Sequence, residues 1–314
     1  MRKQVLFVLG TLAVFRILSV IPIPGVDQGA LAQFLDSNQF FGLLNIFSGG
    51  GLSTLSIVML GVGPYITASI IMQLLTMMSP KLKSMYQEEG AIGRKRFSQY
   101  SRLLSVPLAF AQAFGFIVLL QRQGIVASLD TFALLTNVLV IVAGSVFLMW
   151  LGEVMTEFGI GNGLSMIIFA GIVAVVPQVA SQIFYAFQIE DLFTYIGLGV
   201  LALAMVYLVV FITEAERPIP VTYAKQVRGG KTYGGTSTYL PLRLNQAGVI
   251  PIIFALSLLL LPQMVLNMLT YLQNPTISQI AVFVNDLMKN QWFYAAAYFV
   301  MVFFFTFFYT AVTF

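Results

Sequence analysis

The 314-residue sequence contains neither cysteine nor histidine, and only 9% of its residues are charged. Without thiols or imidazoles it can form no disulfide, no zinc site of the usual kind, and no cysteine nucleophile or histidine base. Soluble domains carry about 25% charged residues. The low charge content, together with 59% hydrophobic residues and a mean hydropathy of +0.90, indicates a protein that crosses a membrane several times.

Eight apolar segments are long enough to cross a hydrocarbon core of about 30 Å, which requires about 20 helical residues. We expect these spans near residues 4–21, 57–78, 103–121, 131–151, 164–186, 194–213, 246–270 and 291–313. The predicted fold class is therefore all-α, a polytopic bundle of membrane helices.

Lysine and arginine are distributed unevenly between the two sides that these spans define. All but three of the 16 basic residues lie at the N-terminus or in the loops 79–102, 152–163 and 214–245. Cytoplasmic loops are enriched in lysine and arginine. The N-terminus and these loops are therefore predicted to be cytoplasmic.

The loop 214–245 is longer than a connection between two spans requires, and glycines gather at its tip. Long exposed loops often carry binding residues. We expect Lys225, Arg228 and Lys231 to contact a partner in the cytoplasm. The alternative is that these charges only set topology and contact lipid headgroups.

Residues 45–66 form an uncharged stretch that contains five glycines and one proline. Glycine costs about 1 kcal/mol and proline about 3 kcal/mol inside a helix. We expect the stretch to break into a short piece, a glycine hinge and a longer helix. Irregular backbone survives at membrane depth only when it is buried in protein or lines a watery cavity. The segment therefore indicates the interior of a channel or transporter.

Arg16 lies well inside the first predicted span. An arginine at the bilayer centre costs about 2.5–3.5 kcal/mol on insertion scales. We expect its side chain to face protein or to extend to an interface, and the sequence assigns it no role.

A series of motifs runs in order along nearly the whole chain and points to a known family. They are Phe15–Arg16, Ile21–Gly25, Phe47–Gly50, Pro64–Ile66, Ala68–Ile71, Gly93–Arg94, Ser98–Tyr100, Phe147–Glu153, Gly159–Gly163, Phe169–Val173, Tyr223–Lys225, Ala247–Pro251, Ile253–Ala255 and Phe307–Ala311. Through these motifs the chain resembles the SecY family, the central channel subunits of the bacterial protein translocase. That family has ten spans, of which eight are recognisable here.

The resemblance implies an hourglass of helices in two pseudo-symmetric halves. Residues 1–186 would form the first half, with spans one to five and a plug near 47–56. Residues 187–314 would form an incomplete second half, with spans six to eight and the loop 214–245. The implied function is a protein-conducting channel, not an enzyme. It would secrete unfolded polypeptides across the bacterial cytoplasmic (inner) membrane and insert helices laterally into it.

The resemblance also implies which residues form the site. A ring of aliphatic side chains would narrow the channel, a plug would close it, and a polar residue would lie at the lateral gate. The ring residues are Ile66, Ile168 and Ile253, with Val62, Leu164 and Val249 one helical turn away. The plug includes Phe47, Ser48, Gly49, Gly50, Gly51 and Leu52, and the gate residue is Asn245.

Sequence spacing agrees with the ring. Val62 and Ile66, like the other two pairs, are four residues apart, so each pair lies on one face of a helix. Aliphatic constrictions block ions by dewetting. The alternative for each isoleucine is ordinary packing against lipid or another helix.

The partners that the resemblance implies are the small membrane subunits SecE and SecG, the motor ATPase SecA and the ribosome. Signal peptides, nascent chains and membrane lipid would also contact the channel. No cofactor, metal ion or catalytic residue is implied.

Two other functions fit the sequence less well than a channel does. A secondary transporter would share the broken helices, but it usually keeps ionisable residues at the midplane, whereas nearly every carboxylate here falls in a loop. An intramembrane enzyme without histidine or cysteine would need paired membrane aspartates or a Ser–Lys pair, and neither is visible.

Overall fold

The structure is a computed structural model. It describes residues 2–24, 28–37, 45, 48, 50–127, 130–188, 191–222, 226–228, 231–233, 237–245, 248, 251–252, 254–256, 258–259, 262 and 275–313. The chain divides into two compact units, Met1–Gln182 with Ile253–Val300, and Ile183–Ile252 with Met301–Phe314. These units are defined by contacts, and the predicted halves 1–186 and 187–314 stay a prediction.

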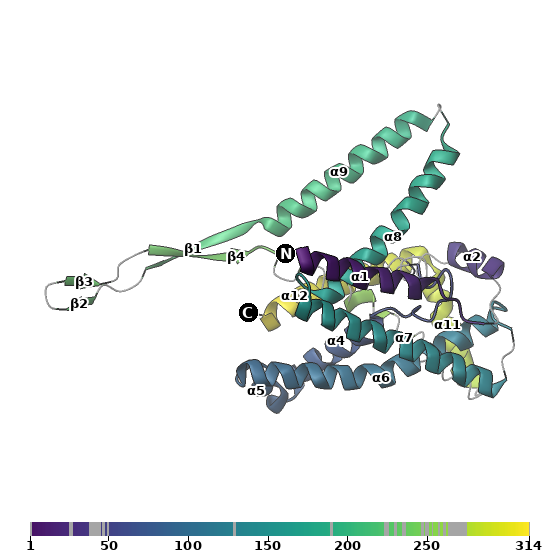
Figure 1. Cartoon of the computed structure of the whole chain (residues 1–314), viewed down its shortest axis with the longest axis horizontal. Helices are drawn as coiled ribbons and strands as arrows, with labels where there is room; N and C mark the ends of the chain where they lie inside the picture. Colours follow the sequence, from purple (N-terminus) through teal and green to yellow (C-terminus); the bar gives the residue numbers. More distant parts are fainter. Residues whose placement is uncertain are drawn as a thin grey trace. The chain divides into compact units, whose positions relative to one another are not determined.

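Helices dominate the described residues of both units (Figure 1). They are α1 (Arg2–Val20), α2 (Gln28–Ser37), α4 (Gly63–Met78), α5 (Pro80–Gln87), α6 (Gly90–Arg122), α7 (Thr131–Phe158), α8 (Gly163–Ala186), α9 (Leu192–Glu214), α11 (Pro275–Lys289) and α12 (Gln291–Thr313). Among these residues, six helices are long and apolar enough to cross a membrane, and α4 is a shorter apolar helix. The predicted bundle of membrane helices is therefore confirmed, while most of the predicted span 246–270 lies outside the described residues.

The basic segment 79–102, which we predicted to be a loop, is mostly helical. α5 begins at Pro80, where a proline is tolerated because the first helical N–H needs no partner. α6 then begins at Gly90 and runs for 33 residues, through Pro107, to Arg122. A helix that extends beyond the bilayer into water is as polar as a loop, so hydropathy does not distinguish the two.

The loop 214–245 also differs from the prediction, because it forms antiparallel β-ribbons in the second unit (Figure 1). β1 (Glu216–Thr222) pairs with β4 (Ser237–Arg243), and β2 (Gln226–Arg228) pairs with β3 (Lys231–Tyr233). The first ribbon contains prolines, which sheets tolerate at free edges. Each strand of a two-stranded ribbon has such a free edge. The prolines and glycines of this segment are typical of turns, so the sequence did not indicate strands.

The larger hydrophobic cluster of the first unit lies where the irregular segment 50–62 meets α6 and α7. Leu52, Leu55 and Met59 from this segment are at most 3% exposed. They pack with residues of α6 such as Phe116 and residues of α7 such as Ile141. The core of this unit is thus built around a segment that is neither helix nor strand.

Candidate functional site

The glycine-rich stretch breaks as the sequence predicts. Residues 50–62 form consecutive turns, and only at Gly63 does α4 begin, with a proline in its first turn. Gly50 has φ +80°, a conformation that glycine adopts without strain. Most residues of this irregular segment are buried in protein, which is the condition for the survival of such backbone at membrane depth.

Neighbouring segments supply hydrogen bonds to this buried backbone. Ile23 N donates to Leu55 O at 2.9 Å, and Ile57 N donates to Ile21 O at 3.1 Å. From α7, Ser145 Oγ donates to Gly61 O at 2.9 Å, although the two residues are far apart in sequence. Because hydrocarbon offers no donors or acceptors, these bonds allow a non-helical segment within the membrane.

α7 approaches this segment closely because residue 144 is a glycine. A Cβ atom at Gly144 would lie 2.9 Å from the carbonyl carbon of Ile57 and would overlap the carbonyl oxygen. It would also lie 3.3 Å from a methyl carbon of Val58. Any side chain at this position would push α7 away from the irregular segment.

A second close approach forms the corner between α7 and α8. A Cβ atom at Gly163 would overlap the carbonyl oxygen of Gly152. Thr156 Oγ donates to Gly152 O at 2.8 Å and accepts from Gly163 N at 2.9 Å. The start of α8 is thus held against the end of α7, and this contact positions Leu164.

The structure brings together four of the six predicted ring residues. Val62, at 3% exposure, belongs to a hydrophobic cluster of α1, α7 and α8 residues, and Ile66, Leu164 and Ile168 pack against the same cluster. The other two, Val249 and Ile253, lie outside the described residues. That these side chains narrow a channel stays a prediction.

The described plug residues form a tight, internally bonded turn. Ser48 Oγ donates to Asn45 O at 3.0 Å and accepts from Leu52 N at 3.2 Å. A Cβ atom at Gly51 would lie 2.9 Å from Ser56 Oγ, so this glycine allows the close packing. The predicted plug residues Phe47 and Gly49 lie outside the described residues.

The remaining predicted site residues belong to the second unit. Asn245 Oδ1 accepts a hydrogen bond from Gly248 N at 3.0 Å, so this side chain stabilises a turn. Arg228 and Lys231 are register partners in the β2–β3 ribbon. Lys225 lies outside the described residues. Roles in gating and docking stay predictions.

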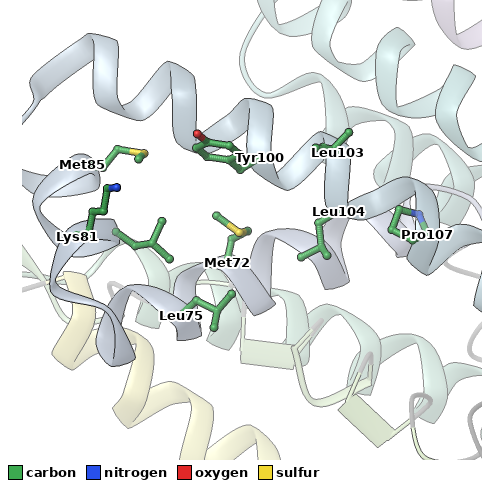
Figure 2. A pocket seen from close by; sticks show the side chains of 9 residues that line it. Met72, Leu75, Lys81, Met85, Tyr100, Leu103, Leu104 and Pro107 are labelled. Carbon is green, nitrogen blue, oxygen red and sulfur yellow. The ribbon is translucent and has the colours of Figure 1, made fainter.

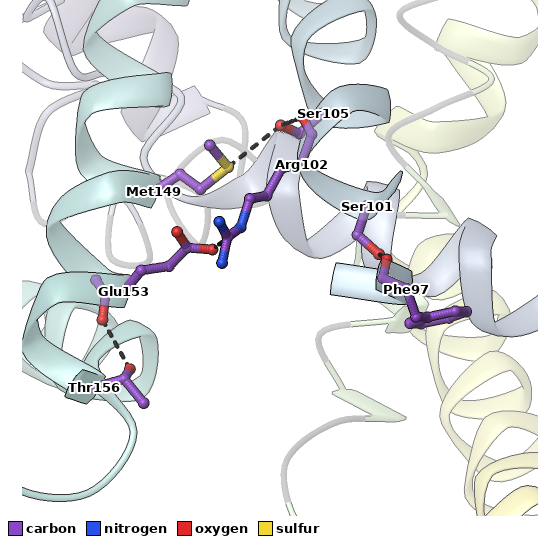
Figure 3. Close-up of polar contacts among 8 residues, drawn as sticks. Phe97, Ser101, Arg102, Ser105, Met149, Glu153 and Thr156 are labelled. Carbon is purple, nitrogen blue, oxygen red and sulfur yellow. Dashed lines mark hydrogen bonds and ion pairs between the residues drawn. The ribbon is translucent and has the colours of Figure 1, made fainter. Parts of the chain in front are cut away.

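Sequence reasoning missed an ion pair between α6 and α7. Arg102 Nε contacts Glu153 Oε1, and one turn further along, Ser105 Oγ lies 3.4 Å from Met149 Sδ (Figure 3). The Glu153 side chain is 22% exposed, so the pair is partly shielded from solvent. The two residues lie on different helices and far apart in the sequence, so no local spacing links them.

An apolar groove of about 620 Å³ opens between α4, α5 and α6 (Figure 2). The residues that line it are Met72, Leu75, Lys81, Leu82, Met85, Tyr100, Leu103, Leu104 and Pro107. Four of these nine residues come from the segment 79–102, which we predicted to be a loop. The sequence therefore offered no indication of this groove.

These observations define a polytopic helical membrane protein in which a broken span is packed inside the protein. A family model described as SecY matches residues 56–314. A protein translocase subunit SecY from Streptomyces coelicolor is 42% identical over 335 residues, covering 100% of this chain and 74% of the relative. The chain therefore belongs to the SecY family of protein translocase subunits.

Solved structures of protein-conducting channels share the fold. One is Sec61 in the canine ribosome-channel complex from the endoplasmic reticulum, with 21% identity and a TM-score of 0.56. Another is a SecY channel whose plug domain is described as stabilising the closed state and maintaining a membrane seal, with 22% identity and a TM-score of 0.55. Each likeness covers 86% of this chain, which spans 59% and 58% of these two channel chains.

Proposed function

We propose that the chain is the central subunit of a channel that moves unfolded polypeptides across the bacterial inner membrane and releases apolar helices sideways into lipid. The observation that carries the proposal is the convergence of Val62 and Ile66 with Leu164 and Ile168 beside a buried, broken span. Membership of the SecY family supports the same conclusion.

The aliphatic residues act as the seal. Two pairs with four-residue spacing, one at the start of α4 and one at the start of α8, pack against the same cluster. Val249 and Ile253 complete the ring from the seventh span. A narrow aliphatic ring excludes water and therefore ions, yet it yields to a polypeptide that is pushed through it.

Residues 47–56 act as the plug that closes the resting channel. The burial of Leu52 and Leu55 and the hydrogen bonds to Ile21 and Ile23 support a docked resting position. The solved relative with a described plug domain supports the assignment. Asn245 acts at the lateral gate, through which signal peptides and membrane helices leave the channel.

The segments 79–102, 152–163 and 214–245 lie in the cytoplasm together with the N-terminus, as the distribution of lysine and arginine indicates. The ribbon of β2 and β3 docks the motor SecA and the ribosome, partners with acidic or phosphate surfaces. Lys225, which precedes β2 in the sequence, contributes to the same docking. The canine relative was solved in a ribosome-channel complex, which supports this part. SecE and SecG brace the channel within the membrane.

The test replaces Ile66 or Ile168 with asparagine in the complete translocase, reconstituted in a planar bilayer. We expect a higher resting ion conductance, because an amide in the ring favours wetting. Val173→Asn is the matched control: Val173 is an exposed residue of α8, 44% exposed, and lies on another face from Ile168. Conductance equal to wild type in both ring variants, at equal channel numbers, would refute the assigned seal.

A further inference from the structure

Arg16 is a charged residue within the first span for which the proposed channel gives no role. It lies near the end of α1, and its Nη1 atom donates to Ser19 Oγ at 3.4 Å. A Cβ atom at Gly50 would lie 3.7 Å from the same Nη1 atom. The guanidinium therefore lies against the backbone of the plug turn.

A second contact connects the same two segments. Thr54 Oγ donates to the carbonyl oxygen of Ser19 at 2.9 Å, and Ser19 is 1% exposed. Ser19 Oγ in turn donates to Arg16 O at 2.8 Å. Ser19 thus contacts Arg16 through its hydroxyl and Thr54 through its backbone carbonyl, so the three residues form one connected group.

The turn that carries these contacts is well defined. Gly50 has φ +80°, and its carbonyl oxygen accepts from Ser53 Oγ at 2.7 Å. Just beyond it, the backbone bonds of Leu55 and Ile57 with the strand-like segment after α1 hold the base of the turn. Residues 50–54 can leave α1 without disturbing this base only if the Ser19–Thr54 bond breaks.

We propose that Arg16, Ser19 and Thr54 form a latch that holds residues 50–54 against α1 in the closed channel, and that opening the channel releases this latch. The proposal rests on the plug assignment made above. A cation in an apolar environment is stabilised by nearby carbonyl and hydroxyl dipoles. Departure of the turn takes the backbone of Gly50 away from the Arg16 guanidinium, so the charge favours the closed state.

The competing explanation is that Arg16 only extends to the membrane interface and sets the depth of α1. The two explanations predict different behaviour for Thr54, which carries no charge and belongs to the plug turn. If the residues form a latch, Arg16 and Thr54 both shift the equilibrium between the closed and the released plug. If Arg16 only anchors the depth of α1, a change at Thr54 does not alter the effect of a change at Arg16.

The experiment uses the complete translocase carrying Leu52→Cys, because the natural chain has no cysteine and Leu52 is 3% exposed. An impermeant maleimide then reports release of the plug, alongside resting ion conductance. We expect Arg16→Gln and Thr54→Val each to raise the labelling rate roughly tenfold, which corresponds to about 1.4 kcal/mol. Arg16→Lys, which keeps the charge, should restore most of the protection.

The double variant decides whether the residues share one latch. Arg16→Gln with Thr54→Val should label no faster than the faster single variant, because both changes release the same contact group. Thr11→Val is the matched control: its hydroxyl is also on α1 and buried, but it donates to Phe7 O within the helix. Its labelling rate should equal that of the parent, and fully additive effects of the two latch changes would refute the proposal.

Deletion of residues 47–54 separates failure of the latch from failure of the plug. If the deletion leaks while both single variants stay sealed and protected, the plug assignment survives and the latch is wrong. If the deletion does not leak, the plug assignment is wrong and the latch with it. Should Arg16→Gln fail to insert, Thr54→Val decides alone, and wild-type protection in that variant refutes the latch.

Discussion

Gly144→Ala tests whether the broken span depends on the close approach of α7. The added methyl group would lie 2.9 Å from the carbonyl carbon of Ile57 and 3.3 Å from a methyl carbon of Val58, and it would overlap the Ile57 carbonyl oxygen. Two of these atoms belong to the backbone of Ile57, and the third belongs to Val58, which is fully buried. None of them can move aside as the end of a flexible side chain could. The helix and the segment must therefore separate.

The expected loss follows from three terms. Overpacking a filled interior costs about 1–3 kcal/mol. Separation also weakens the bond from Ser145 Oγ to Gly61 O, and an unsatisfied buried acceptor costs about 1–3 kcal/mol. Alanine recovers about 1 kcal/mol through its helix propensity. The net destabilisation is about 1–5 kcal/mol, and we expect a lower thermal midpoint.

The assay is thermal unfolding of the complete translocase in lipid nanodiscs. Gly10→Ala on α1 and Gly197→Ala on α9 are matched controls, because a Cβ atom at either position meets nothing within 4 Å. Both control variants should melt at or above the wild-type midpoint. If Gly144→Ala melts together with these controls, the argument from close approach is refuted.

Two further predictions concern the cytoplasmic face. A single cysteine that replaces Lys83 or Arg228 should react with an impermeant thiol reagent added on the cytoplasmic side. A cysteine that replaces Asp36 should react only from the opposite side. Labelling of positions 36 and 228 from the same side would overturn the predicted topology. Reversing Arg228 and Lys231 to glutamate should weaken binding of the motor or ribosome most strongly at low salt, where attraction is least screened. Arg217→Glu, at the base of the ribbon, is the control and should have a smaller effect. If the double variant binds with unchanged affinity at low salt, Arg228 and Lys231 only set the topology and do not dock a partner.

Much of the architecture could be predicted from local properties of the sequence. Long apolar runs located the helices, since the free energy of placing each residue in hydrocarbon is nearly a local quantity. The glycines and the proline of residues 45–66 predicted the break before α4, because backbone preferences are local as well. Ordered motifs then identified the family, and family membership implied ring residues whose described members do pack together.

The tertiary structure decided features that depend on residues distant in sequence. The ion pair of Arg102 with Glu153, and the contact of Arg16 with the plug turn, each join two segments whose separation along the chain gives no signal. Helix α5 and the β1–β4 ribbon were missed because a polar segment outside the bilayer has the same composition as a helix, a ribbon or a loop. Gly144 is the clearest case. In the sequence it is one more small residue of an apolar helix, and only the carbonyl of Ile57 opposite it explains why no side chain fits there.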